Sequence, residues 1–242
     1  MFTALALLAC LRAAPASPAA APAMVQRPLP WGEERCDLTI AYLRRHNPPI
    51  AQGQAPASCE MVPRMVVIHW TGTRSLEAAW ATFAPVRLVG RPDLAWAGEV
   101  NVSAHFLVDR DGAIVQGMPA DRVARHAIGL NHLAIGIENV GGLPGLPLTA
   151  AQVAADAALV RWLAQTWPIT HLIGHHEYRA LEGTPLFQEA DSAYRNRKAD
   201  PGPEFMAALR AAVADLGLQG AAAGPDAPTG GEQGRSPGVG TP

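Results

Sequence analysis

Charge is scarce in this sequence, and neither sign dominates. Asp, Glu, Lys and Arg make up 17% of the 242 residues, and the formal net charge is −2. A protein that binds nucleic acid through its phosphates needs a basic surface, so the composition argues against a nucleic-acid partner. Apolar residues reach 49%, which is enough for a hydrophobic core and argues against global disorder. The length permits one large domain or two small ones.

The N-terminal segment lacks an apolar run long enough to cross a bilayer as a helix, which takes about 20 residues. Residues 1–11 are apolar, and an Ala- and Pro-rich stretch follows as far as Ala23. This pattern predicts an export signal over residues 1–23. Within it, Leu7-Leu8-Ala9-Cys10 resembles a bacterial lipobox, in which Cys10 would carry a lipid anchor. The alternative is simple cleavage near Ala23. We expect a periplasmic or outer-membrane-anchored protein, with secretion or a cytoplasmic location as alternatives.

Cysteine is rare, with three residues in the chain. If Cys10 belongs to the export signal, Cys36 and Cys59 remain as an even pair. In an oxidising compartment they could form a disulfide that ties the N-terminal arm to the segment before the first strand of the main domain. The alternative is two unrelated buried thiols.

Helical and strand patterns alternate along the rest of the chain. Apolar runs predict strands at residues 65–69, 134–140 and 169–174, and an Asp-Gly pair predicts a hairpin of residues 103–108 and 113–118. Helical spacing predicts helices at residues 37–45, 75–83, 149–167 and 204–216. One helix lies directly between two strands. We therefore expect an α/β fold with a single central mixed β-sheet flanked by helices.

These elements divide the chain into four segments. After the export signal, residues 24–61 form an N-terminal arm with one helix, and residues 62–216 form the main domain. Residues 217–242 are rich in Gly, Ala and Pro without an apolar period, which predicts a disordered tail.

Side chains that can bind a metal stand near the ends of predicted strands. His69 ends the first strand, His175 follows the last, and Asp200 lies 25 positions further on. Two imidazoles and one carboxylate form a ligand set that holds zinc and leaves a fourth position open for water, as in zinc hydrolases. Glu138 lies on a third strand, and strands of one sheet are a rigid means of bringing distant residues together.

Other residues near these positions offer alternative ligands. His176 is the main rival of His175, and only one of the two can face the metal if they continue a strand, because successive strand residues point to opposite sides. The carboxylates that compete with Asp200 are Glu177, Glu182, Glu189 and Asp191.

Six motifs follow one another in a familiar order: Val67-Ile68-His69-Trp70-Thr71, Ser103-Ala104-His105-Phe106-Leu107-Val108-Asp109-Arg110-Asp111-Gly112, Arg125-His126-Ala127, Ile135-Gly136-Ile137-Glu138, Gly174-His175 and Lys198-Ala199-Asp200-Pro201-Gly202. Together they resemble the type 2 N-acetylmuramoyl-L-alanine amidase family. This family shares its fold with peptidoglycan recognition proteins and phage lysozyme-type amidases. The resemblance covers about residues 62–216.

The resemblance implies a specific chemistry for the site. One zinc ion per chain would be bound by His69, His175 and Asp200, with Glu138 and Lys198 as the catalytic residues. Zinc polarises a carbonyl and acidifies water, a glutamate can accept and return a proton, and a lysine stabilises an oxyanion. These functions match the residue types that the motifs supply.

The implied function is hydrolysis of the amide between the lactyl group of N-acetylmuramic acid and L-alanine of the peptidoglycan stem peptide. Residues 62–216 would then be a zinc amidase catalytic domain, with peptidoglycan or muropeptides as substrate. We expect a monomer. Trp70, His126 and Asn131 are candidate substrate-binding residues. The alternatives are a non-catalytic muropeptide-binding module of the same fold and a cytoplasmic amidase that recycles anhydro-muropeptides.

Two features depart from the family pattern. The interval between His175 and Asp200 is longer than in compact members, and we expect the extra segment, residues 180–195, to be a loop near the cleft that shapes specificity or acts as a lid. Ala104 stands where some relatives have a catalytic tyrosine. The chain thus resembles the glutamate-using branch, which strengthens the assignment of Glu138.

Overall fold

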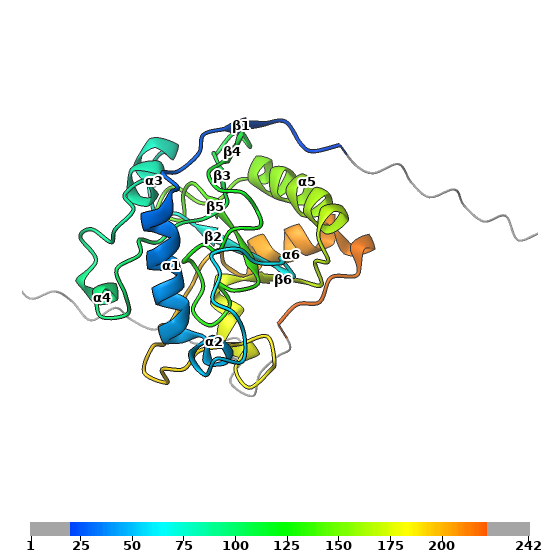
Figure 1. The fold of residues 1–242 in the computed structure, drawn as a ribbon. Coiled ribbons are helices and arrows are strands. Elements are labelled where there is room, and N and C mark those ends of the chain that lie inside the picture. The colour runs from blue at the N-terminus through cyan, green and yellow to red at the C-terminus, as the bar shows by residue number, and fades with distance from the viewer. Residues whose placement is uncertain (1–19, 222–242) are drawn as a thin grey trace, which may run out of the picture.

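The computed structural model describes residues 20–221. Its centre is a six-stranded mixed sheet in the order β1-β4-β3-β5-β2-β6 (Figure 1). β3 and β4 are antiparallel, and the other neighbouring strands are parallel. The strands are β1 (Met24–Gln26), β2 (Met65–Trp70), β3 (Phe106–Val108), β4 (Ile114–Gln116), β5 (Ala134–Asn139) and β6 (His171–Gly174). The predicted α/β fold with one central mixed sheet is confirmed.

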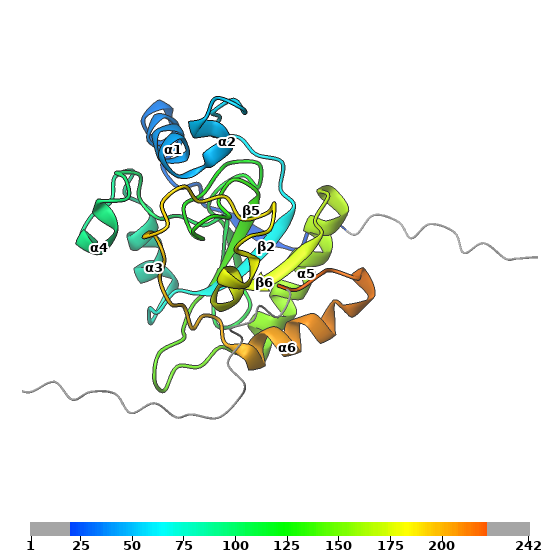
Figure 2. The ribbon, with the colours of Figure 1, turned by 90° about the horizontal axis from the view of Figure 1, so that it is seen from below.

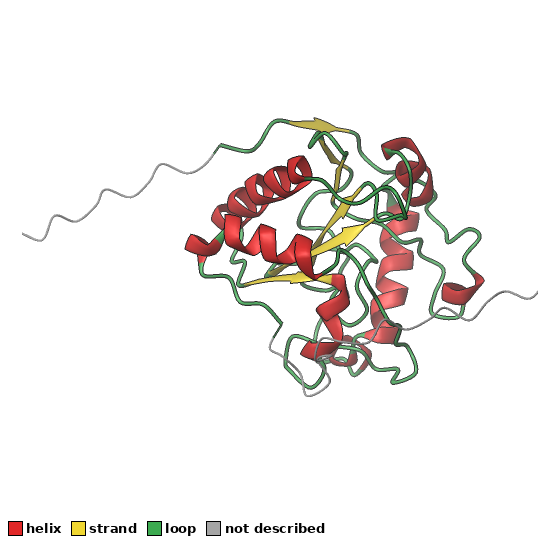
Figure 3. Cartoon of the chain, turned by 180° about the vertical axis from the view of Figure 1, so that it is seen from behind, coloured by secondary structure: helices red, strands yellow, loops and turns green. Residues whose placement is uncertain are grey.

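Helices cover both faces of the sheet. On one face α5 (Ala150–Thr166) packs against α6 (Pro203–Ala212), whereas α1 (Glu33–His46) and α3 (Leu76–Phe83) lie on the other side (Figures 2 and 3). The short elements are the helices α2 (Pro48–Ala51) and α4 (Pro92–Ala95) and the 3₁₀ helices η1 (His175–Leu181) and η2 (Ala214–Leu216). Within residues 20–221, no helix combines the length and apolarity needed to cross a bilayer.

The pleat of β5 determines which face carries the polar residues of the sheet. Asn139 donates a hydrogen bond to Asp156 of α5 at 2.9 Å, so its side chain points toward that helix. Its neighbour Glu138 therefore points to the opposite face, because successive strand residues alternate. His69 of β2 is the register partner of Glu138. Both side chains thus lie on the face turned away from α5 and α6.

The N-terminal arm is more structured than expected. It contributes β1 at the edge of the sheet and two helices, α1 and α2, where a single helix is predicted. β1 has three residues, which is too short for an alternating pattern to appear in the sequence. A second helix begins after Asn47, whose side-chain oxygen accepts a hydrogen bond from the Ile50 amide. An N-cap of this kind favours a new helical turn at the two prolines that end α1.

The arm is attached to the main domain by a covalent bond and a buried arginine. Cys36 and Cys59 form a disulfide in this structure, with their sulfurs 2.04 Å apart, which is the pairing that the sequence predicts. Arg35 is almost fully buried, and its guanidinium donates to the carbonyl oxygens of Phe83 and Pro85 at the end of α3. These contacts fix α1 beside the face that carries His69 and Glu138.

The ordered part of the chain continues past the predicted boundary of the tail. The Gln219 amide donates to the Thr170 carbonyl, and the Leu172 amide donates to the Gln219 carbonyl, each at 2.9 Å. The expectation of a disordered tail from residue 217 is therefore wrong for residues 217–221. The rest of that segment, and residues 1–19 with Cys10, lie outside the described residues.

Candidate metal centre and cleft

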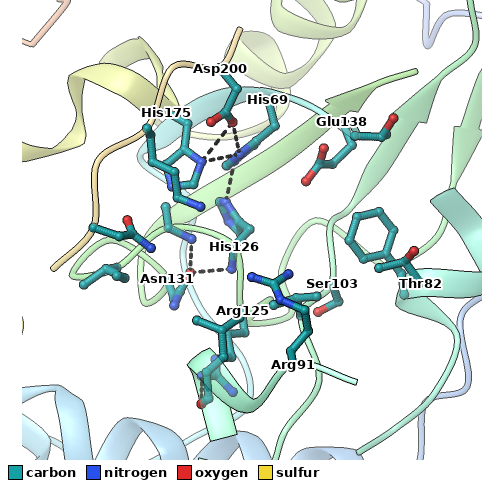
Figure 4. Close-up of a pocket in the computed structure, with 18 of the residues that line it drawn as sticks. His69, Thr82, Arg91, Ser103, Arg125, His126, Asn131, Glu138, His175 and Asp200 are labelled. Atoms are coloured by element: carbon teal, nitrogen blue, oxygen red, sulfur yellow. Dashed lines mark hydrogen bonds and ion pairs between the residues drawn. The ribbon is translucent and has the colours of Figure 1, made fainter. Parts of the chain in front are cut away.

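His69, His175 and Asp200 converge from three separate elements (Figure 4). His69 is on β2, and His175 begins η1 directly after β6. Asp200 lies in the loop before α6, with two residues between it and the helix. His69 Nδ1 is 2.9 Å from His175 Nδ1 and 3.2 Å from Asp200 Oδ2, and His175 Nδ1 is 3.0 Å from the same oxygen. All three side chains are buried. The structure thus brings together the three residues that the sequence predicts.

The spacing of these atoms fits a metal ion. A tetrahedral zinc centre with bonds of about 2.0–2.2 Å places its ligand atoms about 3.3–3.6 Å apart. The observed separations of 2.9–3.2 Å are slightly shorter, and a small outward movement of the side chains makes up the difference. Within residues 20–221, this is the one group of three or more His, Cys, Asp or Glu side chains that could hold an ion.

The protonation states also suit a metal ion. Burial and the neighbouring His69 lower the pKa of His175 to about 3, which leaves a neutral imidazole. Burial alone would raise the pKa of Asp200, but the two imidazoles that face its carboxyl hold that pKa well below its usual range. Neutral imidazoles and an ionised carboxylate are the ligand forms that bind zinc.

Glu138 lies in the same cavity, on the strand beside His69. It is 8% exposed, and its Oε2 has no hydrogen-bond partner within residues 20–221. Burial raises the pKa of Glu138 to about 7, with a further rise from Asp200, while His69 and Lys198 act in the opposite direction. A carboxyl group that titrates near neutrality can both take up and release a proton. Its position and pKa therefore suit general acid–base chemistry.

Lys198 lies two residues before Asp200 and lines the same cavity. It is the only lysine in the chain. Its ammonium group is close enough to Glu138 to lower the pKa of that carboxyl. The site thus combines a group of three side chains that could hold a metal ion, a buried carboxyl and a lysine.

The cavity has a volume of about 260 Å³. β2 and β5 form its floor, and side chains from α1, α3 and the loops around them form its walls. Besides the residues already named, its lining includes Tyr42, Trp70, Thr82, Arg91, Ser103, Arg125, His126, Asn131, Tyr194 and Asn196. Several of these surround the metal-binding group in Figure 4.

The three predicted substrate-binding residues line this cavity, and the polar groups of two of them, His126 and Asn131, are engaged within the protein. His126 places Nδ1 3.0 Å from His69 Nε2 and Nε2 3.0 Å from the Ala134 carbonyl oxygen. Asn131 accepts hydrogen bonds from the amides of His126 and Ala127 and donates to the Tyr42 hydroxyl. Contact of either residue with a substrate stays a prediction.

Trp70, the third of these residues, is half-buried at the end of β2. Its ring packs closely against Gly142, where an added Cβ would come within 2.3 Å of the ring. Gly142 has a φ of +79°, a conformation that favours glycine. Substrate stacking on Trp70 also stays a prediction.

The rival ligands have other partners. His176 Nδ1 and the His176 amide both contact the Asp200 backbone carbonyl, at 3.0 and 2.8 Å. His175 and His176 begin a 3₁₀ helix, so the selection of His175 does not arise from strand alternation as expected. Glu177 accepts from the Gly174 amide and pairs with Arg210. The remaining acids bind elsewhere: Glu182 to Arg179 and Arg195, Glu189 to His46, and Asp191 to the Ala193 amide.

The extra segment, residues 180–195, is attached to the N-terminal arm. Glu189 Oε1 lies 2.8 Å from His46 Nδ1 in a buried pair, and the Ala190 amide donates to the His46 carbonyl. Phe187 packs on Gly129, whose added Cβ would lie 2.5 Å from its ring. Of the two expected roles, these contacts favour a fixed wall that shapes the cleft.

Sequence reasoning missed the residues that join this wall to the cavity. Arg125 is buried, and its guanidinium donates to the Tyr194 hydroxyl and to the carbonyl oxygens of Leu94 and Val100. Tyr42 reaches the cavity from α1 and lies beneath this guanidinium, 4.9 Å from its carbon. Arg125 stands next to His126 in the motif Arg125-His126-Ala127. This neighbourhood is the sequence signal that could have indicated that Arg125 lies at the cavity.

The fold and the three-residue group define a family, and the comparison with known families agrees. Residues 60–203 match the family model described as N-acetylmuramoyl-L-alanine amidase, the type 2 amidases. The match covers more than half of the sequence, and the chain belongs to this family. The resemblance seen in the motifs is thereby confirmed.

Particular relatives include both bacterial and phage proteins. The chain is 36% identical over 124 residues to the 1,6-anhydro-N-acetylmuramyl-L-alanine amidase AmpD of Salmonella typhimurium, covering 47% of this chain and 58% of that protein. It is 31% identical over 95 residues to the endolysin of Enterobacteria phage K11, covering 37% of this chain and 62% of the endolysin. The matches thus span about three fifths of the length of these curated relatives.

A solved structure shows the same fold. The endolysin N-acetylmuramoyl-L-alanine amidase LysCS from Clostridium intestinale URNW superposes with a TM-score of 0.50 at 20% sequence identity. The alignment covers 82% of this chain and 97% of the endolysin. This likeness is one of fold.

Proposed function

We propose that this protein is a zinc-dependent N-acetylmuramoyl-L-alanine amidase. Its reaction would be hydrolysis of the amide between the lactyl group of N-acetylmuramic acid and L-alanine of the stem peptide. The observation that carries the proposal is the convergence of two imidazoles and one carboxylate within 3.2 Å of one another, beside the buried Glu138. Membership of the family supports the choice of bond.

His69, His175 and Asp200 would hold the zinc ion. When bound, zinc supplies Lewis-acid polarisation of the scissile carbonyl and makes water more acidic. The other two functions that the reaction requires are proton transfer and stabilisation of the developing negative charge. Glu138 and Lys198 would supply them.

Glu138 moves the proton. Its carboxylate accepts a proton from the attacking water and later delivers it to the nitrogen of the departing L-alanine. A pKa near 7 lets one group perform both transfers at neutral pH. Lys198 adds positive charge where the carbonyl oxygen becomes negative in the tetrahedral state, and a fixed positive charge at that point lowers the barrier.

Export to an oxidising compartment is part of the proposal. The Cys36–Cys59 disulfide supports it, because such bonds persist mainly outside the cytosol. This favours the periplasmic expectation over cytoplasmic recycling of anhydro-muropeptides. The lipid anchor at Cys10 and the monomeric state remain predictions.

Two variants and one control test the amidase. Glu138→Gln keeps the shape of the side chain but removes the base, so we expect a rate loss of about 10²–10⁴-fold with zinc content unchanged. His175→Ala removes a ligand and should lose both zinc and activity. His171→Ala serves as the control, because His171 is half-exposed on β6 outside the cavity and should behave as wild type. Retention of normal turnover by Glu138→Gln on a purified muropeptide would overturn the assignment of the base.

A further inference from the structure

His126 and His69 form a contact that the proposed chemistry leaves unused. The rings are 5.1 Å apart at their centroids and nearly perpendicular, and His69 Nε2 lies 3.0 Å from His126 Nδ1 (Figure 4). His69 Nδ1, on the opposite side of its ring, faces His175 and Asp200. One ring nitrogen of His69 thus faces the metal-binding group, and the other faces His126.

His69, His126 and the backbone carbonyl of Ala134 form a chain of hydrogen bonds, and the carbonyl fixes the direction of each bond. His126 Nε2 lies 3.0 Å from the carbonyl oxygen of Ala134 on β5, and a carbonyl oxygen can only accept. His126 Nε2 therefore carries a hydrogen. The ring is buried, and among the described residues its two nitrogens contact only His69 and the Ala134 carbonyl, with no carboxylate beside them. The ring is therefore neutral and its Nδ1 is an acceptor.

The acceptor on His126 fixes the tautomer of His69. Since His126 Nδ1 accepts, His69 Nε2 must be the donor, and its proton lies on the side away from the metal-binding group. His69 Nδ1 then presents a lone pair toward Asp200 and His175. We propose that His126 is a positioning residue that fixes the tautomer and ring orientation of His69 by linking its Nε2–H to the backbone of β5.

The surroundings of His126 hold its ring in this position. The amides of His126 and Ala127 both donate to Asn131 Oδ1, at 2.9 and 2.8 Å. The ring lies directly over Gly136 of β5, where an added Cβ would come within 3.0 Å of it. A larger residue at position 136 would displace the ring, so the glycine provides its space.

His175 has no comparable support. Its Nε2 is buried without a hydrogen-bond partner among the described residues. The two imidazoles of the group therefore differ in support: the ring of His69 is held by a hydrogen bond at its second nitrogen, and the ring of His175 is not. Metal-binding histidines usually donate their second nitrogen to a carboxylate, a carbonyl or water, and loss of that partner weakens metal affinity about 10–100-fold. Here an imidazole occupies that place and passes the bond on to a carbonyl.

Two amide substitutions separate positioning from packing. His126→Asn places an amide oxygen near the position of Nδ1, so it keeps the acceptor for His69. His126→Gln places its amide near the position of Nε2, so it keeps the bond to Ala134 but offers His69 no acceptor. If His126 only fills space, the two variants should behave alike.

The readout is zinc affinity measured by competition with a chelator, with the thermal midpoint of the metal-free protein as a control for folding. We expect His126→Gln to bind zinc about 10–100-fold more weakly than wild type. His126→Asn should stay within about threefold of wild type. Equal zinc affinity for both variants would overturn the inference.

A second measurement needs no variant. Long-range ¹H–¹⁵N spectra of the metal-free wild-type protein report which nitrogen of each histidine carries the hydrogen. We expect Nε2–H on both His69 and His126. Absence of the hydrogen from Nε2 of either ring would contradict the inference, even if both variants failed to fold.

The inference rests on the proposed function only in treating His69 as a zinc ligand. Neither readout uses catalysis, so the two can fail separately. If zinc affinity depends on the acceptor at position 126 but the protein cleaves no amide, only the proposed function is contradicted. If the His126→Gln variant cleaves the amide at the wild-type rate and binds zinc as tightly as wild type, only the inference is contradicted.

Discussion

Asp156 is a buried carboxyl group whose charge should destabilise the fold at neutral pH. It lies on α5 beneath the sheet with no exposed surface, and its Oδ1 has no hydrogen-bond partner in the part of the chain that the structure describes. Its Oδ2 accepts one hydrogen bond from Asn139, which also donates to the backbone carbonyl of His69. Replacement by asparagine keeps the shape and an acceptor oxygen but leaves no charge to bury.

The size of the effect follows from the pKa. Burial raises the pKa of Asp156 from 3.8 to about 7, and the hydrogen bond from Asn139 only partly opposes this. Between those two pH values the folded state holds a proton that the unfolded state has lost. The unfolding free energy therefore falls as pH rises from about 4 to about 7, and it is level above that. A shift of roughly three units corresponds to at most about 4 kcal/mol.

The assay is urea unfolding followed by tryptophan fluorescence, in chelator and without reductant, at pH 4 and pH 7.5. Asp156→Asn should gain stability relative to wild type by up to about 4 kcal/mol more at pH 7.5 than at pH 4. Asp37→Asn, an exposed change on α1, is the control and should show no pH-dependent difference. A difference between Asp156→Asn and wild type that is the same at both pH values would refute the reasoning.

Two further predictions concern the arm and the cleft. The disulfide closes a loop between positions 23 apart, so the double change Cys36→Ser and Cys59→Ser should lower the unfolding free energy by about 3 kcal/mol. Reduced wild type should match that variant in urea unfolding, and an unchanged midpoint in both would contradict the prediction. Because Lys198 is the only lysine, acetylation of amines, located by mass spectrometry, should lower turnover by about 10²-fold. Full acetylation of Lys198 without loss of rate would show that its charge is not needed.

The metal-binding group could be predicted from the sequence because its members stand in local patterns. His69 ends an apolar β-branched run, and His175 follows another, so both lie at strand ends that the sheet brings together. Asp200 was harder to select, because several acids lie in the preceding segment. The structure separates them by their partners: Glu177, for example, is held by Arg210 and the Gly174 amide.

The features that sequence could not supply depend on contacts between distant segments. β1 forms because β4 offers an edge, and three residues cannot encode that pairing by themselves. The wall made by residues 180–195 depends on the buried pair of His46 and Glu189, which are 143 positions apart. The link between His126 and His69 depends on which ring nitrogen faces Ala134, and a sequence pattern does not encode ring orientation.

The most direct test of the account is the identity of the product. The purified zinc-loaded protein is incubated with intact sacculi and, separately, with soluble muropeptides, and the products are analysed by mass spectrometry. The account predicts a free stem peptide beginning with L-alanine and a saccharide with a free lactyl carboxyl, and no such product after chelation. Cleavage between sugars or within the peptide, or no cleavage by protein that holds one zinc ion per chain, would contradict it.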